Sequence, residues 1–152
     1  MPTHYEGDEG TRRALDAYIK LSRATKAMWS RLNRNLTEYD LTLSQLGTLE
    51  ALHFLGPLFQ KDLSEKLLVT GGNITMVVNN LEKRGLVTRE RNQQDRRQVL
   101  VSLTSKGEAL IKAVFPQHAD QITAMLSVLS PADQDELGRL CKSLGLTASR
   151  ES

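Results

Sequence analysis

One short stretch of this sequence carries the side chains best suited to binding a polyanion. The run RNQQDRRQVLVSLTSKG, residues 91–107, places Asp95, Arg96 and Arg97 next to one another in a polar loop. The formal net charge of the whole chain is only +2. Residues 83–97 nevertheless contain two acids, Glu90 and Asp95, and six basic side chains: Lys83, Arg84, Arg89, Arg91, Arg96 and Arg97. Such a local basic patch is the electrostatic footprint expected of a nucleic-acid-binding surface.

Two predicted strands hold this loop at the tip of a β-hairpin. Val99 and Val101 alternate with polar or smaller residues, which is the pattern of a strand with one buried face. Segments 86–91 and 98–103 are therefore predicted to be strands, with residues 92–97 as the tip between them.

Two short helices are predicted just before the hairpin. Apolar residues at helical spacing place them near 60–67 and 71–84. Thr70, in the turn between them, is suited to cap the second helix, and Gly85 is suited to end it. Two short helices joined by a tight turn are a candidate helix-turn-helix.

Further helices precede this pair. Apolar residues at alternating spacings of four and three predict one long helix over 11–36. Thr42 and Gln45 have the spacing of a capping box, which predicts the start of a second helix over about 43–54.

Two more helices follow the hairpin. Thr104 is expected to cap a long helix, which Pro116 should kink because proline lacks an N–H donor and clashes with the preceding turn. Pro131 is expected to open the last helix and Gly145 to end it. We therefore expect a mainly α fold of the α+β class, with a small β-hairpin wing, forming a single domain over 1–152.

The hairpin and its surroundings resemble a known family. The segment LEKRGLVTRERNQQDRRQVLVSLTSKGEAL is similar to the signature of the MarR family of bacterial transcription regulators, in its leucine-glutamate before Lys-x-Gly, its Asp-x-Arg wing tip and its Leu-Thr-x-x-Gly restart. The resemblance implies a winged helix-turn-helix over about 40–103, with dimerisation helices over about 11–36 and 105–145. It also implies a homodimeric DNA-binding transcription regulator, a repressor, that binds a palindromic operator and is released by a small effector.

The second helix of the helix-turn-helix presents side chains that can contact bases. Asparagine can bond an adenine edge, threonine or methionine can contact a thymine methyl, and lysine can bind a guanine or a phosphate. A helix N-terminus also carries free N–H groups and a partial positive charge that suit a phosphate. The candidate DNA-binding residues are Thr70, Asn73, Thr75, Met76, Asn79 and Lys83. The alternative is that they form only the polar solvent face of a helix.

The family resemblance implies separate roles for the wing residues. It assigns Arg97 to the minor groove, and a flat, permanent cation suits a narrow A-T groove with enhanced negative potential. Asp95 is then the acceptor that fixes Arg97 or the hairpin turn, and Arg96 binds a phosphate. The alternative is a solvated loop without a partner.

Three positions depart from the family pattern. Met76 stands where many relatives carry arginine, and Asn79 stands where many carry aspartate. Phe59 replaces the serine or threonine that usually caps the helix starting near residue 60. We therefore expect base reading to shift toward apolar and amide contacts.

The resemblance also implies a small aromatic effector, phenolic or quinone-like. Family members tend to bind such ligands between the dimerisation helices and the winged module. The candidate lining residues are Met28, Trp29, Tyr39, His53, Phe54 and Phe115. The FPQH run at 115–118 is similar to that of quinone- or phenol-responsive members. The alternative for each residue is ordinary core packing.

Other site chemistries find little support in the sequence. No nucleophile, base and orienting group occur in a recognisable order, so we expect neither an enzyme nor a cofactor. His4, His53 and His118 lack metal-ligand spacing with one another and with Cys141, so a metal site would have to be assembled in space. Cys141 lies on the apolar stripe of the last helix, which favours packing over redox sensing.

The composition limits the remaining function classes. Hydrophobic residues make up 39% and charged residues 25% of the chain, as in a globular protein. No run of about 18 apolar residues occurs, and the polar, acidic start is unlike a secretory signal. We expect a cytoplasmic protein without membrane contact. The rival class is a winged-helix module that binds protein instead of DNA, and the basic stretch 83–97 argues against it.

Overall fold

The chain folds into two compact units. The computed structural model describes residues 2–67 and 71–150, and the two units comprise residues 1–116 and 117–152. Thr70, the predicted cap of the second helix of the helix-turn-helix, lies outside the described residues. The first unit contains the elements expected to contact DNA.

The first unit is mostly helical, and its helix starts are explained by local hydrogen bonds. Asp8 caps the first helix by accepting a hydrogen bond from the Thr11 N–H (2.9 Å). The predicted capping box is confirmed, because Thr42 Oγ1 accepts from the Gln45 N–H (3.2 Å) and Gln45 Oε1 accepts from the Thr42 N–H (3.1 Å). In chain order the helices are α1 (Glu9–Leu36), η1 (Thr37–Tyr39), α2 (Leu43–Leu55), α3 (Gln60–Lys66), α4 (Gly71–Lys83) and α5 (Ser105–Leu126).

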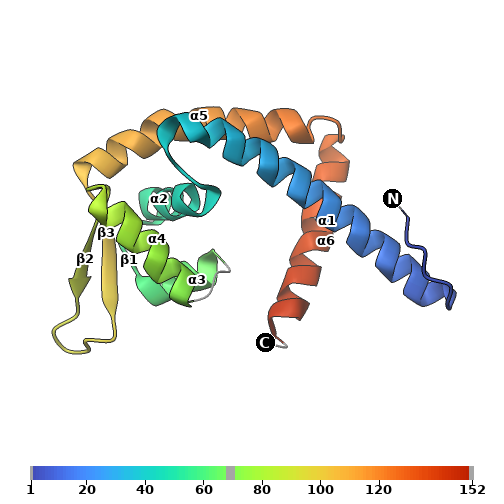
Figure 1. Cartoon of the computed structure of the whole chain (residues 1–152), viewed down its shortest axis with the longest axis horizontal. Coiled ribbons are helices and arrows are strands. Elements are labelled where there is room, and N and C mark those ends of the chain that lie inside the picture. Colours follow the sequence, from blue (N-terminus) through green and yellow to red (C-terminus); the bar gives the residue numbers. More distant parts are fainter. Residues whose placement is uncertain (1, 68–70, 151–152) are drawn as a thin grey trace. The chain divides into compact units, whose positions relative to one another are not determined.

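Among the described residues, three antiparallel strands accompany these helices, in the order β1-β3-β2. The predicted hairpin is formed by β2 (Val87–Arg91) and β3 (Val99–Leu103), which pair along their whole length. The sequence did not predict β1 (Leu58–Phe59), which pairs with β3 and places Leu58 opposite Val101. Figure 1 shows β2 and β3 extending away from α2 and α4 to the tip loop.

One hydrophobic core holds the sheet against the helices of the first unit. Leu49 of α2, Leu63 of α3, Val78 and Leu81 of α4, and Val101 of β3 have no exposed surface. Burying one such side chain contributes about 1.5–3 kcal/mol relative to leaving it in water. Packing therefore fixes α4 against α2, α3 and the sheet.

The turn from α4 to β2 is tight and tied to α5. Gly85, the predicted end of α4, has a φ of 70°, a left-handed conformation that glycine adopts without strain. Thr104 Oγ1 donates to the Gly85 carbonyl (2.6 Å) and accepts from the Gly107 N–H (3.0 Å). One threonine thus caps α5, as predicted, and anchors the turn before the wing.

The second unit contains the rest of α5 and α6 (Pro131–Arg150). Ser130 caps α6, because its Oγ accepts from the Asp133 N–H (3.1 Å). The prediction that Gly145 ends this helix is wrong, since α6 continues through it. A glycine stops a helix when it turns to the left-handed region, and the described glycines that do so are Gly56 and Gly85.

The apolar stripe of α6 is open to solvent in the single chain. Leu140 and Leu144 are exposed, and so is Cys141 on the same stripe. The packing predicted for Cys141 therefore does not occur within one chain. Over the described residues, no helix combines the length and apolar character needed to cross a membrane.

Candidate nucleic-acid interface

Asp95 and Arg97 form a hydrogen-bonded ion pair at the wing tip. The Asp95 carboxylate accepts hydrogen bonds from the Arg97 backbone N–H (3.1 Å), Nε (3.1 Å) and Nη2 (3.4 Å). The bonds from the Arg97 side chain, and then from its backbone, hold the pKa of Asp95 below its ordinary value. The Arg97 side chain is still 91% exposed. The guanidinium is thus oriented by its neighbour and open to solvent at the same time.

Further hydrogen bonds close the loop between the two strands. The Asn92 N–H donates to the Gln98 carbonyl (2.9 Å), and the Gln98 N–H donates to the Asp95 carbonyl (3.0 Å). Arg91 Nη1 donates to the carbonyl of Arg96 (3.2 Å), whose own side chain is exposed. The polar groups of the loop therefore specify its shape.

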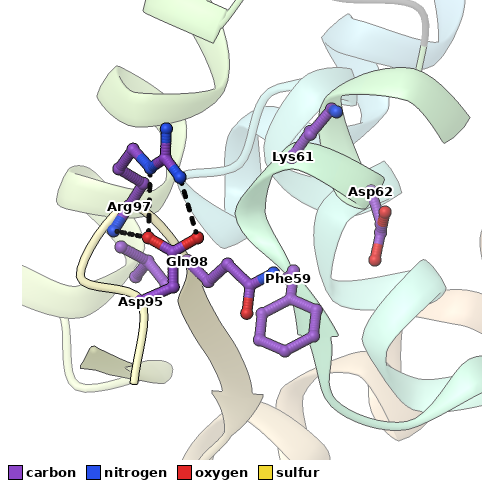
Figure 2. A pocket seen from close by; sticks show the side chains of 7 residues that line it. Phe59, Lys61, Asp62, Asp95, Arg97 and Gln98 are labelled. Carbon is purple, nitrogen blue, oxygen red and sulfur yellow. Dashed lines mark hydrogen bonds and ion pairs between the residues drawn. The ribbon is translucent and has the colours of Figure 1, made fainter. Parts of the chain in front are cut away.

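A pocket of about 510 Å³ lies between the wing tip and the start of α3. Figure 2 shows the side chains that line it from the two elements: Asp95, Arg97 and Gln98 from the wing, and Phe59, Lys61 and Asp62 from the other side. Phe59 occupies the N-cap position of α3 without a side-chain capping bond, as its type predicts. Lys61, which the sequence did not single out, adds a cation near Arg97.

The outward face of α4 carries three of the predicted DNA-binding residues. The opposite face is buried through Ile74, Val78 and Leu81. At 100° per residue, Met76, Asn79 and Lys83 project from the side of the helix away from these core positions. Met76 is 58% exposed, Lys83 is exposed and Asn79 is half-buried.

Two other predicted residues lie on the flanks of α4. Thr75 Oγ1 accepts a hydrogen bond from Gln60 Nε2 (2.8 Å), which joins α4 to α3. Asn73 lines a pocket together with Trp29 of α1. The predicted set is therefore divided between the outward face and two neighbouring helices.

Two arginines of the basic stretch are engaged within the protein. Arg84 donates from Nη1 to the Asp40 carbonyl (2.6 Å) and from Nη2 to the Tyr39 carbonyl (3.2 Å), so it binds the segment after α1. Arg89 Nη2 donates to Glu82 Oε1 (2.9 Å). A count of basic residues cannot separate these arginines from those that face outward, because the contacts depend on the fold.

Three of the predicted effector-pocket residues form an aromatic cluster. The rings of His53 and Phe54 have centroids 4.7 Å apart, and those of Phe54 and Phe115 are 5.0 Å apart, both edge to face. His53 Nδ1 also lies 3.0 Å from Glu108 Oε1. The hydrogen bond from His53, followed by one from Lys112, lowers the pKa of Glu108. His53 therefore lies beside a carboxylate of the protein.

The other three predicted effector-pocket residues lie elsewhere. Trp29 lines a pocket of about 520 Å³ formed by α1, α2 and α4, a size suited to a small ligand. Tyr39 packs against the core and Met28 is half-buried on α1. Over residues 2–67 and 71–150, the lining consists of apolar, hydroxyl and amide side chains without a charged one: Trp29, Thr42, Leu43, Ser44, Gln45, Thr48, Leu67, Asn73, Ile74, Met76, Val77 and Asn80.

A helix-turn-helix, a hairpin with an exposed arginine at its tip and an outward polar face on α4 define a winged-helix DNA-binding protein. A family model described as the MarR family matches residues 39–98. The HTH-type transcriptional regulator MhqR of Bacillus subtilis (strain 168) is 32% identical over 140 residues, which cover 92% of this chain and 97% of that protein. The chain therefore belongs to the MarR family and is a DNA-binding transcription regulator, as the resemblance implied.

Solved structures with the same fold agree with this assignment. The S. aureus MepR–DNA complex superposes with a TM-score of 0.76 at 28% identity, covering 86% of this chain and 97% of that chain. NadR in complex with 4-hydroxyphenylacetate gives a TM-score of 0.72 at 26% identity, covering 95% and 97%. The relatives of this chain are transcription regulators, not enzymes.

Proposed function

We propose that the chain is a cytoplasmic, homodimeric repressor that binds a palindromic operator and is released by a small effector. The exposed guanidinium of Arg97, oriented by Asp95, carries the proposal. A flat, permanent cation on a projecting hairpin suits a narrow A-T minor groove. In this role Asp95 shapes the wing, Arg97 enters the groove and Arg96 binds a phosphate.

The outward face of α4 supplies the proposed major-groove contacts. Met76 packs against a thymine methyl, Asn79 bonds an adenine edge, and Lys83 binds a guanine or a phosphate. Asn73 and Thr75, on the flanks of α4, are secondary contacts. Thr70, which directly precedes Gly71 in the sequence, stays a predicted contact outside the described residues.

Exposed apolar side chains on α1 and α6 support the homodimer. They include Tyr18 and Leu21 of α1 and Leu140 and Leu144 of α6. Apolar surface of this extent is unfavourable in water, and a second copy of the chain removes it by covering it. A two-fold dimer presents two recognition helices to half-sites about one DNA turn apart, which matches a palindromic operator.

The pocket lined by Trp29 supports an uncharged phenol or quinone as the effector. NadR, a relative in fold and sequence, has been solved with an aromatic ligand. The hydroxyl and amide groups of the pocket here suit a phenol or a quinone, and among the described residues no lysine or arginine lines it to bind a carboxylate. Because Asn73 and Met76 of α4 also line the pocket, an occupant can bias the position of the recognition helix.

A fluorescence anisotropy titration tests the DNA-binding part of the proposal. The probe is duplex DNA from immediately upstream of the chain's own gene, and the control is a scrambled duplex of equal length. Binding should be tighter to the upstream duplex and should weaken with salt, with a slope of about −0.9 per phosphate contacted. Affinity without salt dependence, or none for any duplex, would support the rival protein-binding module.

The effector is tested in the same assay. Hydroquinone, added to the preformed complex, should release the upstream duplex. Trp29→Ala should require more hydroquinone for release while binding the duplex in its absence. Release at the same concentration from both proteins would remove the pocket from the proposal.

A further inference from the structure

A single carboxylate bridges α4 and the wing. Glu82 lies in the last turn of α4, and Arg89 lies in the middle of β2, on the other side of the turn at Gly85. Glu82 Oε1 accepts from Arg89 Nη2 (2.9 Å), and Glu82 Oε2 accepts from the Arg89 backbone N–H (3.2 Å). The carboxylate therefore binds both the main chain and the side chain of one wing residue.

This contact satisfies one backbone N–H on the edge of β2 that has no neighbouring strand among the described residues. β2 is an edge strand, whose sheet partner is β3. The Arg89 N–H is directed to Glu82 instead of β3, so the recognition helix satisfies an edge group that would otherwise face water. The side chains of Arg89 and Glu82 are 29% and 39% exposed, so solvent screens the pair only in part. The mutual hydrogen bonds lower the pKa of Glu82 and raise that of Arg89.

The angle of the wing relative to α4 determines the position of Arg97. At about 3.3 Å per residue, the end of the hairpin that carries Arg97 lies roughly 20 Å beyond the turn at Gly85, because the Asn92 N–H is hydrogen-bonded to the carbonyl of Gln98, the neighbour of Arg97. A rotation of about 10° at the turn between α4 and β2 would therefore move the tip by roughly 3 Å, well beyond the tolerance of about 0.5 Å for a binding contact. The angle between wing and helix decides whether both reach their grooves together.

We propose that Glu82 is a positioning residue for operator binding, which sets the angle of the wing to α4 through Arg89. The inference rests on the proposed function, because it requires that α4 and Arg97 contact the same DNA. From its charge alone, the Glu82 carboxylate would be expected to weaken operator binding. Removing an acid from a DNA-binding surface reduces phosphate repulsion and should strengthen binding. A loss of affinity on removing Glu82 must therefore come from geometry.

Anisotropy titrations of three variants against the upstream duplex test the geometric role. Glu82→Ala should weaken binding about tenfold, comparable to the loss of one base contact. Glu82→Gln should lose less, because its amide oxygen can still accept one of the two hydrogen bonds. Glu90→Ala, the matched control, removes an exposed acid from β2, next to Arg89, and should bind at least as tightly as the unaltered chain. Tighter binding by Glu82→Ala would overturn the inference.

A double variant that combines Glu82→Ala with Arg97→Ala distinguishes a positioning role of Glu82 from a general loss of structure. If Glu82 acts through the wing, Glu82→Ala costs affinity only while Arg97 is present, so the double variant should bind no worse than Arg97→Ala alone. Additive losses would show that Glu82 acts by another route and would overturn the inference while leaving the wing contact intact. Unchanged affinity of Arg97→Ala by itself would overturn the wing contact, and this inference with it.

Discussion

At the scale of single residues, the ion pair of Asp95 and Arg97 leaves the side chain proposed to bind DNA both oriented and open to solvent. Asp95 orients the guanidinium through two hydrogen bonds and accepts a third from the Arg97 backbone N–H, yet the Arg97 side chain remains almost fully exposed. Ion pairs this exposed contribute little to stability, because water screens them. Replacing part of this ion pair by contacts with a DNA groove should therefore cost little free energy.

Replacing Arg97 by alanine should weaken operator binding by roughly 1 to 3 kcal/mol, the cost of one specific contact. The loss should be larger when the base pairs under the wing are A-T than when they are G-C, because the narrow A-T groove attracts arginine. Anisotropy titrations with the two kinds of duplex measure this difference. Arg96→Ala is the control, since loss of a phosphate contact should weaken all duplexes alike and reduce the salt slope by about 1. Equal behaviour of the two variants would contradict the division of roles.

The Asp95 carboxyl should titrate below the ordinary aspartate range in the free protein. Its pKa is lowered by hydrogen bonds from Arg97, so its contribution to the folded state is present above about pH 4 and is lost as pH falls through the lowered pKa. A carboxyl NMR titration should show this low midpoint. In Arg97→Ala the midpoint should rise toward the ordinary aspartate range, because the larger of the two causes that lower this pKa is removed. An identical midpoint in both proteins would show that the side chain of Arg97 does not hold the carboxylate.

At the scale of elements, close packing explains why position 107, the last of the Leu-Thr-x-x-Gly sequence, is a glycine. A Cβ on Gly107 would overlap the carbonyl oxygen of Leu86, so the start of α5 packs directly on the turn between α4 and the wing. Gly107→Ala should destabilise the fold by about 1–3 kcal/mol, because a well-packed site must shift. Urea denaturation measures the change.

Gly138 in α6 is the matched control for this substitution. A Cβ there meets no atom within 4 Å. Gly138→Ala should therefore be neutral or should stabilise the chain by up to about 1 kcal/mol, since alanine is the better helix former. Equal destabilisation by the two substitutions would argue against the close packing of α5 on the turn.

Elements with a strong local signal could be predicted from the sequence. The long apolar repeat of α1 and the Thr42–Gln45 box of α2 are local patterns, and the structure confirms both. β1 escaped prediction, because two residues have no periodicity and its partner strand lies some forty positions further along. The helix end predicted at Gly145 is wrong, because the neighbouring residues of α6 form helix and override the preference of glycine for a helix end.

In the candidate site, too, local contacts could be predicted from the sequence and contacts between distant elements could not. Asp95 and Arg97 are two residues apart, so their contact is visible in the sequence. The bond between Glu82 and Arg89 is not visible, because it depends on the angle between a helix and a strand. The separation of Trp29 from the aromatic cluster depends likewise on tertiary packing, which the residue types alone do not reveal.

At the scale of the whole molecule, operator recognition is proposed to need two copies of the chain. In that proposal one wing and one recognition helix would cover only a half-site, and a dimer would double the number of phosphates contacted. Salt dependence is a direct measure of that number, because each contacted phosphate releases counterions. The assembly state and the salt slope should therefore change together.

Leu140→Glu should convert the proposed dimer into a monomer and thereby alter DNA binding. Leu140 is exposed on α6 of the single chain, and a buried carboxylate at the proposed interface would be strongly unfavourable. Sedimentation equilibrium should show half the mass, and anisotropy should show weaker binding with a salt slope of about half the original value, as expected for one half-site. Lys142→Glu, two residues further along α6 and away from its apolar stripe, is the control and should remain dimeric. A dimeric Leu140→Glu protein with the full slope would exclude this stripe of α6 from the interface.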